Sequence, residues 1–117
     1  PISALAEAVE ETRTDIAASG IPGPILGHVG DGNFHAILMV DPERAEEIAL
    51  AKALAERMAE RSLRLGGTIT GEHGVGFGKL GLMAAEHGEG WQVMGRVKAA
   101  LDPLNLMNPG KLVPGQP

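Results

Sequence analysis

An Asp-Gly pair at positions 31–32 is the strongest constraint on the fold, because it separates two short apolar runs, residues 25–29 and 34–40. Glycine adopts positive φ without steric cost and aspartate tolerates it, so Asp-Gly favours the tight turn of a β-hairpin. The sequence therefore predicts an antiparallel hairpin with a two-residue turn, in which His28 pairs directly with His35.

This predicted pairing would make the hairpin a metal-binding element. Directly opposed residues on one face of a sheet have Cβ atoms about 5 Å apart. Two imidazoles held in that way can converge on one ion with bonds of about 2.0–2.1 Å. A shift of one residue would send them to opposite faces, so the turn determines the site. The alternative, that His28 and His35 only line a hairpin, stays open.

Helical periodicity flanks the hairpin on both sides. Residues 2–18 have the apolar spacing of an amphipathic helix, and a second helix is predicted to begin with Asp41 as its N-cap and to end at Gly66-Gly67. Residues 68–70 favour a short strand, residues 80–86 and 91–101 favour helices, and the tail from Asp102 is predicted to be irregular. This order predicts an α+β fold, a partial ferredoxin-like (split βαβ) unit that lacks its first strand, followed by C-terminal helices.

A second motif, Gly71-Glu72-His73-Gly74, adds a carboxylate and a third imidazole. Neighbours on an extended segment point in opposite directions, so Glu72 could complete a His₂Glu ligand set while His73 moves protons. The alternative is a flexible turn after a strand. A phosphate-binding P-loop is excluded because His73 and Leu80 occupy positions that need glycine and Ser/Thr. Glu86 and His87 are predicted to be solvated at the end of a surface helix.

Composition excludes several classes of function. The net charge is −5 and aromatic residues make up 3%, which argues against nucleic-acid binding. The chain has no cysteine, so disulfides, thiolate zinc sites and iron–sulfur clusters are absent. No apolar run approaches the ~18 residues of a transmembrane helix. The helical pattern starts without a start signal, so we expect a chain cut from a longer one.

Three separated motifs together resemble one family. They are the segment 27–35 (Gly-His-Val-Gly-Asp-Gly-Asn-Phe-His), the segment 70–76 (Thr-Gly-Glu-His-Gly-Val-Gly), and Leu101-Asp102-Pro103 followed by Met-Asn-Pro-Gly-Lys at 107–111. Over residues 1–113 the chain resembles the C-terminal part of the flavin-linked D-2-hydroxyacid dehydrogenases. That family includes D-lactate dehydrogenase (cytochrome), the glycolate oxidase flavoprotein subunit and D-2-hydroxyglutarate dehydrogenase.

The resemblance implies roles for individual residues. Residues 1–117 would form the C-terminal cap and substrate-and-metal-binding domain, with the FAD-binding domain absent. Zinc or manganese would be held by His28, His35 and Glu72. His73 would bind the substrate and remove its hydroxyl proton while a hydride passes to FAD. The resemblance also implies that Asn33 meets the substrate and that the flavin side is contacted by Asn108 and Lys111.

The resemblance further implies a small 2-hydroxy acid substrate, and an apolar Ile37 favours a lactate-like one. Cytochrome c, a quinone or an electron-transfer flavoprotein would accept the electrons. We expect a cytoplasmic location, at the periphery of the inner membrane and mitochondrial in a eukaryote, a homodimer, and an isolated chain without activity. Three other functions stay open: a stand-alone metal- or small-molecule-binding module, a structural dimerisation domain, and a metal-dependent hydrolase.

Overall fold

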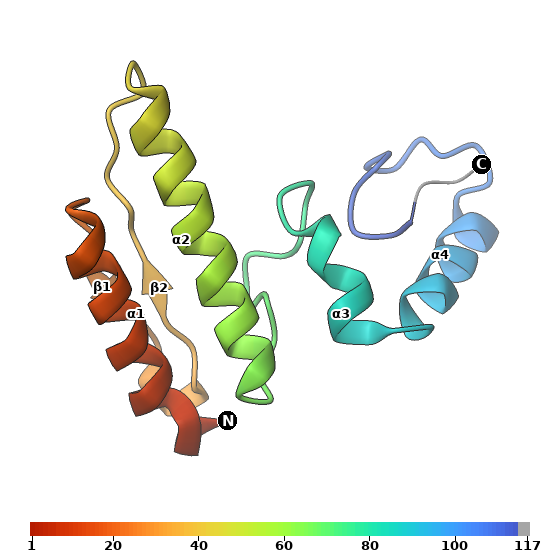
Figure 1. Cartoon of the computed structure of the whole chain (residues 1–117). Coiled ribbons are helices and arrows are strands. Elements are labelled where there is room, and N and C mark those ends of the chain that lie inside the picture. The colour runs from red at the N-terminus through yellow and green to blue at the C-terminus, as the bar shows by residue number, and fades with distance from the viewer. Residues whose placement is uncertain (115–117) are drawn as a thin grey trace. The chain divides into compact units, whose positions relative to one another are not determined.

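The helical periodicity of the N-terminal residues becomes helix α1, Leu5–Ser19, preceded by a 3₁₀ turn, Ile2–Ala4, and ended by Gly20 with φ 74°. The computed structural model describes residues 1–114 (Figure 1). It divides into a first unit, Pro1–Gly71, and a second that begins at Glu72. The first unit continues with strands β1, Ile25–Leu26, and β2, His35–Ala36, and with helix α2, Ala45–Arg64.

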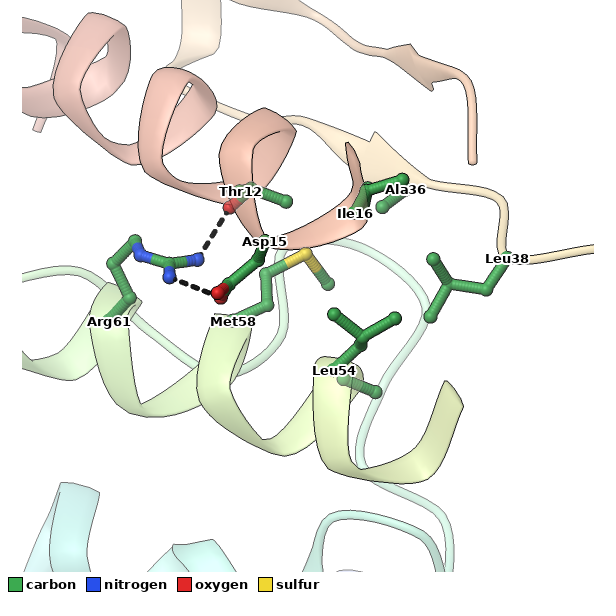
Figure 2. A pocket seen from close by; sticks show the side chains of 9 residues that line it. Thr12, Asp15, Ile16, Ala36, Leu38, Leu54, Met58 and Arg61 are labelled. Carbon is green, nitrogen blue, oxygen red and sulfur yellow. Dashed lines mark hydrogen bonds and ion pairs between the residues drawn. The ribbon is translucent and has the colours of Figure 1, made fainter. Parts of the chain in front are cut away.

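The core of the first unit lies where α1, β2 and α2 meet (Figure 2). Ile16 is 7% exposed and Leu54 is 4% exposed, and with Ala36 and Leu38 they line the small cavity between the three elements. A Cβ built on Gly23 would lie 2.7 Å from Ile16 Cγ2, so the chain before β1 packs directly on α1. Side chains alternate along a strand, so His35, Ile37 and Met39 face away from this cavity.

The hairpin forms, but the predicted register is wrong. Leu26 lies opposite His35, and Ile25 lies opposite Ala36. Residues 27–34 form the connection in place of a two-residue turn, and they contain a 3₁₀ turn, Val29–Asp31, that ends at Gly32 with φ 70°. The N–H groups of Asp31 and Asn33 both donate to the carbonyl of His28, at 2.9 and 3.3 Å, so the connection closes on that residue.

Two further elements differ from the sequence predictions. Helix α2 begins at Ala45, with Arg44 as N-cap, because Asp41 accepts a 2.9 Å hydrogen bond from the Glu43 N–H and caps the turn before the helix. Residues 68–70 form no strand, although Ile69 is buried at 6% exposure. The α+β class is confirmed, with one two-stranded sheet among residues 1–114. The ferredoxin-like arrangement stays a prediction.

Helices α1 and α2 are joined by an ion-pair cluster centred on Arg61, whose side chain is 10% exposed. Its guanidinium donates to Glu11 Oε2 at 2.8 Å, to Asp15 Oδ2 at 2.6 Å and to Thr12 Oγ1 at 2.8 Å (Figure 2 shows Asp15 and Thr12). Hydrogen bonds from Arg61 hold the pKa values of Glu11 and Asp15 below their ordinary range. The cluster fixes how the two helices pack.

Replacing Arg61 with methionine should therefore destabilise the first unit. Removing one partner of a buried pair costs about 3–5 kcal/mol, but the acidic partners here are 42% and 28% exposed, so we expect about 1–3 kcal/mol. Urea unfolding measures the change. Arg13→Met removes an exposed pair with Glu10 within α1 and should have no measurable effect. Equal effects of both variants would contradict the role of Arg61.

The second unit contains a 3₁₀ turn, Leu80–Leu82, helix α3, Met83–His87, and helix α4, Gly90–Leu101. Both predicted helices are confirmed, and the predicted irregular tail is confirmed for residues 102–114. The last three residues of that prediction, 115–117, lie outside the described part of the chain. Met83 is 1% exposed and anchors this unit. Glu86 and His87 are not fully solvated as predicted, since their side chains are 12% and 32% exposed and lie 3.6 Å apart.

Asp102 organises the tail that follows α4. It is 6% exposed and accepts hydrogen bonds from the Lys98 ammonium and from the N–H groups of Leu106, at 2.9 Å, and Met107, at 2.8 Å. The Lys98 hydrogen bond, helped by the two backbone donors, lowers the pKa of Asp102 from 3.8 to about 2.

This depressed pKa gives the stability of the tail a defined pH dependence. The ionised carboxylate contributes fully above its unfolded pKa of 3.8, and the contribution is lost as the pH falls through the folded pKa of about 2. Asp102→Asn should therefore destabilise the chain at pH 6 and match the parent near pH 2. Thermal unfolding at both pH values measures the difference. A difference that does not change with pH would contradict the assignment.

Candidate metal centre

The two hairpin histidines lie beside each other although they do not pair across the strands. His28 is exposed and precedes the 3₁₀ turn of the connection, while His35 is half-buried and begins β2. Their ring centroids are 6.2 Å apart and the ring planes are perpendicular. The connection, residues 27–34, thus places the His28 ring beside the His35 ring. The two imidazoles lie close together, as predicted, although His28 and His35 do not pair across the strands.

Glu72 joins them. One ring nitrogen from each of His28 and His35 and one carboxylate oxygen of Glu72 all lie within 4.8 Å of one another. Ligands on a tetrahedral ion with bonds of about 2.1 Å are about 3.4 Å apart, so side-chain rotations are enough to close the set. Imidazole nitrogens and a carboxylate oxygen suit zinc, and manganese also accepts them. The donor set therefore fits a divalent transition metal.

Close packing of the hairpin connection places Glu72. A Cβ built on Gly71 would lie 2.6 Å from Asn33 Oδ1, so a larger residue here would displace the Asn33 amide. Glu72 is bonded directly to Gly71 and is positioned by that link. Asn33 therefore lies next to Gly71, the residue that precedes the predicted ligand Glu72.

Gly27 allows the same closeness within the hairpin. A Cβ there would lie 2.3 Å from the Asn33 carbonyl oxygen and 2.5 Å from Phe34 Cα, and both are backbone atoms that cannot rotate away. Gly27→Ala should open the connection and cost about 1–3 kcal/mol, measured by urea unfolding. Gly30→Ala is the matched control, because nothing lies within 4 Å of its Cβ position. An equally stable Gly27→Ala variant would contradict this packing.

His73 is not one of the three converging residues, but it lies next to one of them, Glu72. Its Nε2 is 3.5 Å from Glu72 Oε1, and its side chain is 75% exposed. The prediction that Glu72 and His73 point in opposite directions is wrong, because residues 71–73 form a bend and not a strand. The bend leaves a titratable imidazole beside a candidate metal ligand, which is a suitable position for a proton acceptor.

The predicted flavin-side residues lie together in the second unit. Lys111 Nζ is 3.4 Å from Asn108 Oδ1 and 5.2 Å from the ring centroid of Phe77. Asn108 has φ 47°, a left-handed conformation that is uncommon outside glycine. Phe77 is 64% exposed and was not predicted as part of this group. Its place between glycines was the only sequence signal.

None of the helices in residues 1–114 combines the length and apolar character that crossing a bilayer requires.

Comparison with known proteins identifies the family of the chain. The family described as FAD linked oxidases, C-terminal domain, matches residues 1–112. The chain is 48% identical over 114 residues to a probable mitochondrial D-lactate dehydrogenase of Danio rerio, covering 97% of this chain and 23% of that protein. It is 44% identical over 115 residues to a mitochondrial D-lactate dehydrogenase (cytochrome) of Arabidopsis thaliana, covering 97% of this chain and 20% of that protein.

A glycolate oxidase subunit of Bacillus subtilis is 37% identical over 113 residues, covering 96% of this chain and 24% of that protein. The chain thus spans between a fifth and a quarter of the length of these curated relatives.

Proposed function

The chain belongs to the family of FAD-linked oxidase C-terminal domains, and from that premise we propose that it supplies the substrate- and metal-binding side of a flavin-dependent D-2-hydroxy acid dehydrogenase. The observation that carries the proposal is the convergence of donor atoms from His28, His35 and Glu72 within 4.8 Å. Relatives named D-lactate dehydrogenase and glycolate oxidase support a small 2-hydroxy acid as substrate. The substrate we propose is D-lactate or a similar acid.

In this proposal the ligands hold zinc or manganese, which as a Lewis acid would favour ionisation of the substrate hydroxyl. FAD would accept the hydride from C2. The chain's own residues orient the substrate and handle its proton. Asn33, against the backbone of Gly71, offers an amide to a substrate oxygen, and His73 takes up the hydroxyl proton. The Glu72 carboxylate 3.5 Å from His73 stabilises the imidazolium formed.

We propose that Asn108 and Lys111 meet the flavin side. Lys111 supplies a positive charge and Asn108 supplies amide donors, and the 3.4 Å separation of Lys111 Nζ and Asn108 Oδ1 lets both address one anionic or carbonyl group. Residues 1–114 do not contain a nucleotide-binding loop, so the bulk of the FAD contacts would come from elsewhere in the enzyme. We therefore propose that residues 1–117 alone are inactive.

The relatives also suggest partners and location. The Arabidopsis thaliana relative is named for cytochrome, so we propose a cytochrome c-type electron acceptor, with a quinone or an electron-transfer flavoprotein as alternatives. The Danio rerio and Arabidopsis thaliana relatives both carry the word mitochondrial, which supports a mitochondrial location in a eukaryote. A homodimer also stays a proposal, to be measured by size-exclusion chromatography.

Anaerobic mixing of the complete gene product with D-lactate tests the function. We expect D-lactate to bleach the flavin absorbance and L-lactate to leave it unchanged. This bleaching by D-lactate should be lost when the metal is removed by a chelator, and it should be restored by zinc or manganese. If no small D-2-hydroxy acid reduces the flavin of the metal-loaded enzyme, the proposal is overturned.

A further inference from the structure

The observed register gives the metal ligand His35 an apolar neighbour that the predicted register did not. Leu26 lies directly across the strands from His35, on the same face. Directly opposed residues have Cβ atoms about 5 Å apart. Leu26 is 52% exposed, so it is available to a ligand bound beside His35.

The alternation of β2 extends this apolar surface. Ala36 and Leu38 line the cavity against α1 and α2, so His35, Ile37 and Met39 face the opposite side. Ile37 and Met39 are 50% and 52% exposed. We call Leu26, His35, Ile37 and Met39 the outer face of the hairpin. It has one metal ligand at one end and three apolar side chains next to it.

We propose that Leu26, together with Ile37, forms the wall that receives the C2 substituent of the substrate and selects 2-hydroxy acids with aliphatic substituents. This inference rests on the proposed function, in which His28, His35 and Glu72 would hold a metal that supplies the anchor for the carboxylate and hydroxyl oxygens of the substrate. The substituent at C2 then projects within reach of the side chains that flank His35 on the same face.

Charge also favours an apolar substituent. None of the four residues of the outer face is a lysine or an arginine, so a second substrate carboxylate in contact with them would lose water without gaining a cation from them. An aliphatic substituent, in contrast, gains about 0.8 kcal/mol for each methylene buried, equivalent to about fourfold in affinity. The outer face therefore discriminates by attraction to apolar groups and by penalty on dicarboxylates.

Titration of the zinc-loaded full chain by methyl NMR tests this inference. The ligands are glycolate, which has no C2 substituent, D-lactate, D-2-hydroxyisovalerate and D-2-hydroxyglutarate. We expect affinity to rise about fourfold for each added methyl or methine group along the first three, with shifts at the Leu26 and Ile37 methyl signals, and hydroxyglutarate to bind weakest.

Variants of Leu26 sharpen the test. Leu26→Asn should flatten the series, and Leu26→Lys should raise the affinity for hydroxyglutarate at least about tenfold by pairing its second carboxylate. Leu50→Asn, at a 37% exposed position on α2, is the matched control and should change nothing. Zinc content is measured first. Absence of zinc overturns both proposals, whereas bound zinc with a flat series, or a series unchanged in Leu26→Asn, overturns this inference alone.

Discussion

Replacing His35 with alanine should reduce the zinc affinity of the chain by at least about 100-fold. Loss of even an outer-shell partner of a metal ligand costs 10–100-fold, and His35 supplies one of only three converging donors, so its removal leaves His28 and Glu72 as a two-ligand site. Competition with a chromophoric chelator measures the affinity. Because His35 is half-buried beside the core, circular dichroism must show that the variant is folded.

His87→Ala is the matched control for this experiment. His87 is also an imidazole next to a carboxylate, 3.6 Å from Glu86 Oε1, but it belongs to no group of three donors among residues 1–114. The His87→Ala variant should bind zinc as tightly as the parent chain. If His35→Ala and the control keep the same affinity, the converging donors do not form the metal site.

The second large effect is expected at His73. In the complete gene product, His73→Asn should lower kcat by about 10²–10⁴-fold, the range for loss of a general base. Zinc content should stay at the parent level, because His73 lies outside the ligand set. Stopped-flow absorbance measures the rate of flavin reduction, the step that requires loss of the substrate's hydroxyl proton.

Metal analysis of the same variant separates two roles for His73. Its Nε2 lies 3.5 Å from Glu72 Oε1, close enough that a rotation could bring the imidazole to an ion held by Glu72. Loss of zinc in parallel with activity would show that His73 is a fourth ligand and not the base. Full activity in His73→Asn would show that the proton goes elsewhere.

The sequence predicted the helices well, because a 3.6-residue apolar period is a local property. The spacing of Ile2, Leu5, Val9 and Ile16 marked α1, and Gly66-Gly67 marked the end of α2. The start of α2 was predicted too early, because Asp41 accepts a hydrogen bond from the Glu43 N–H and so caps the turn that precedes the helix.

The hairpin register could not be predicted, because it depends on contacts within the connection. An Asp-Gly pair favours a two-residue turn, but here the 3₁₀ turn and the close approach of Gly27 to the Asn33 carbonyl lengthen the loop. Pairing shifts by two residues, and side chains alternate with a period of two, so His35 keeps its predicted face. The closeness of His28 and His35 was therefore predicted correctly, although the strand pairing from which it was predicted was wrong.

The relation of Glu72 to His73 failed for a similar reason. A strand at residues 68–70 would have carried the alternation forward, but the segment bends at residues 71–73 and brings the two side chains together. Leu26 was not predicted to lie opposite His35, because that pairing follows only from the observed register.

X-ray absorption spectroscopy of the zinc-loaded full chain tests the central claim most directly. The account predicts a first shell of nitrogen and oxygen at about 2.0–2.1 Å with multiple scattering from two imidazoles, falling to one in His35→Ala. A shell without imidazole scattering, or the same two imidazoles after His35 is removed, would contradict it.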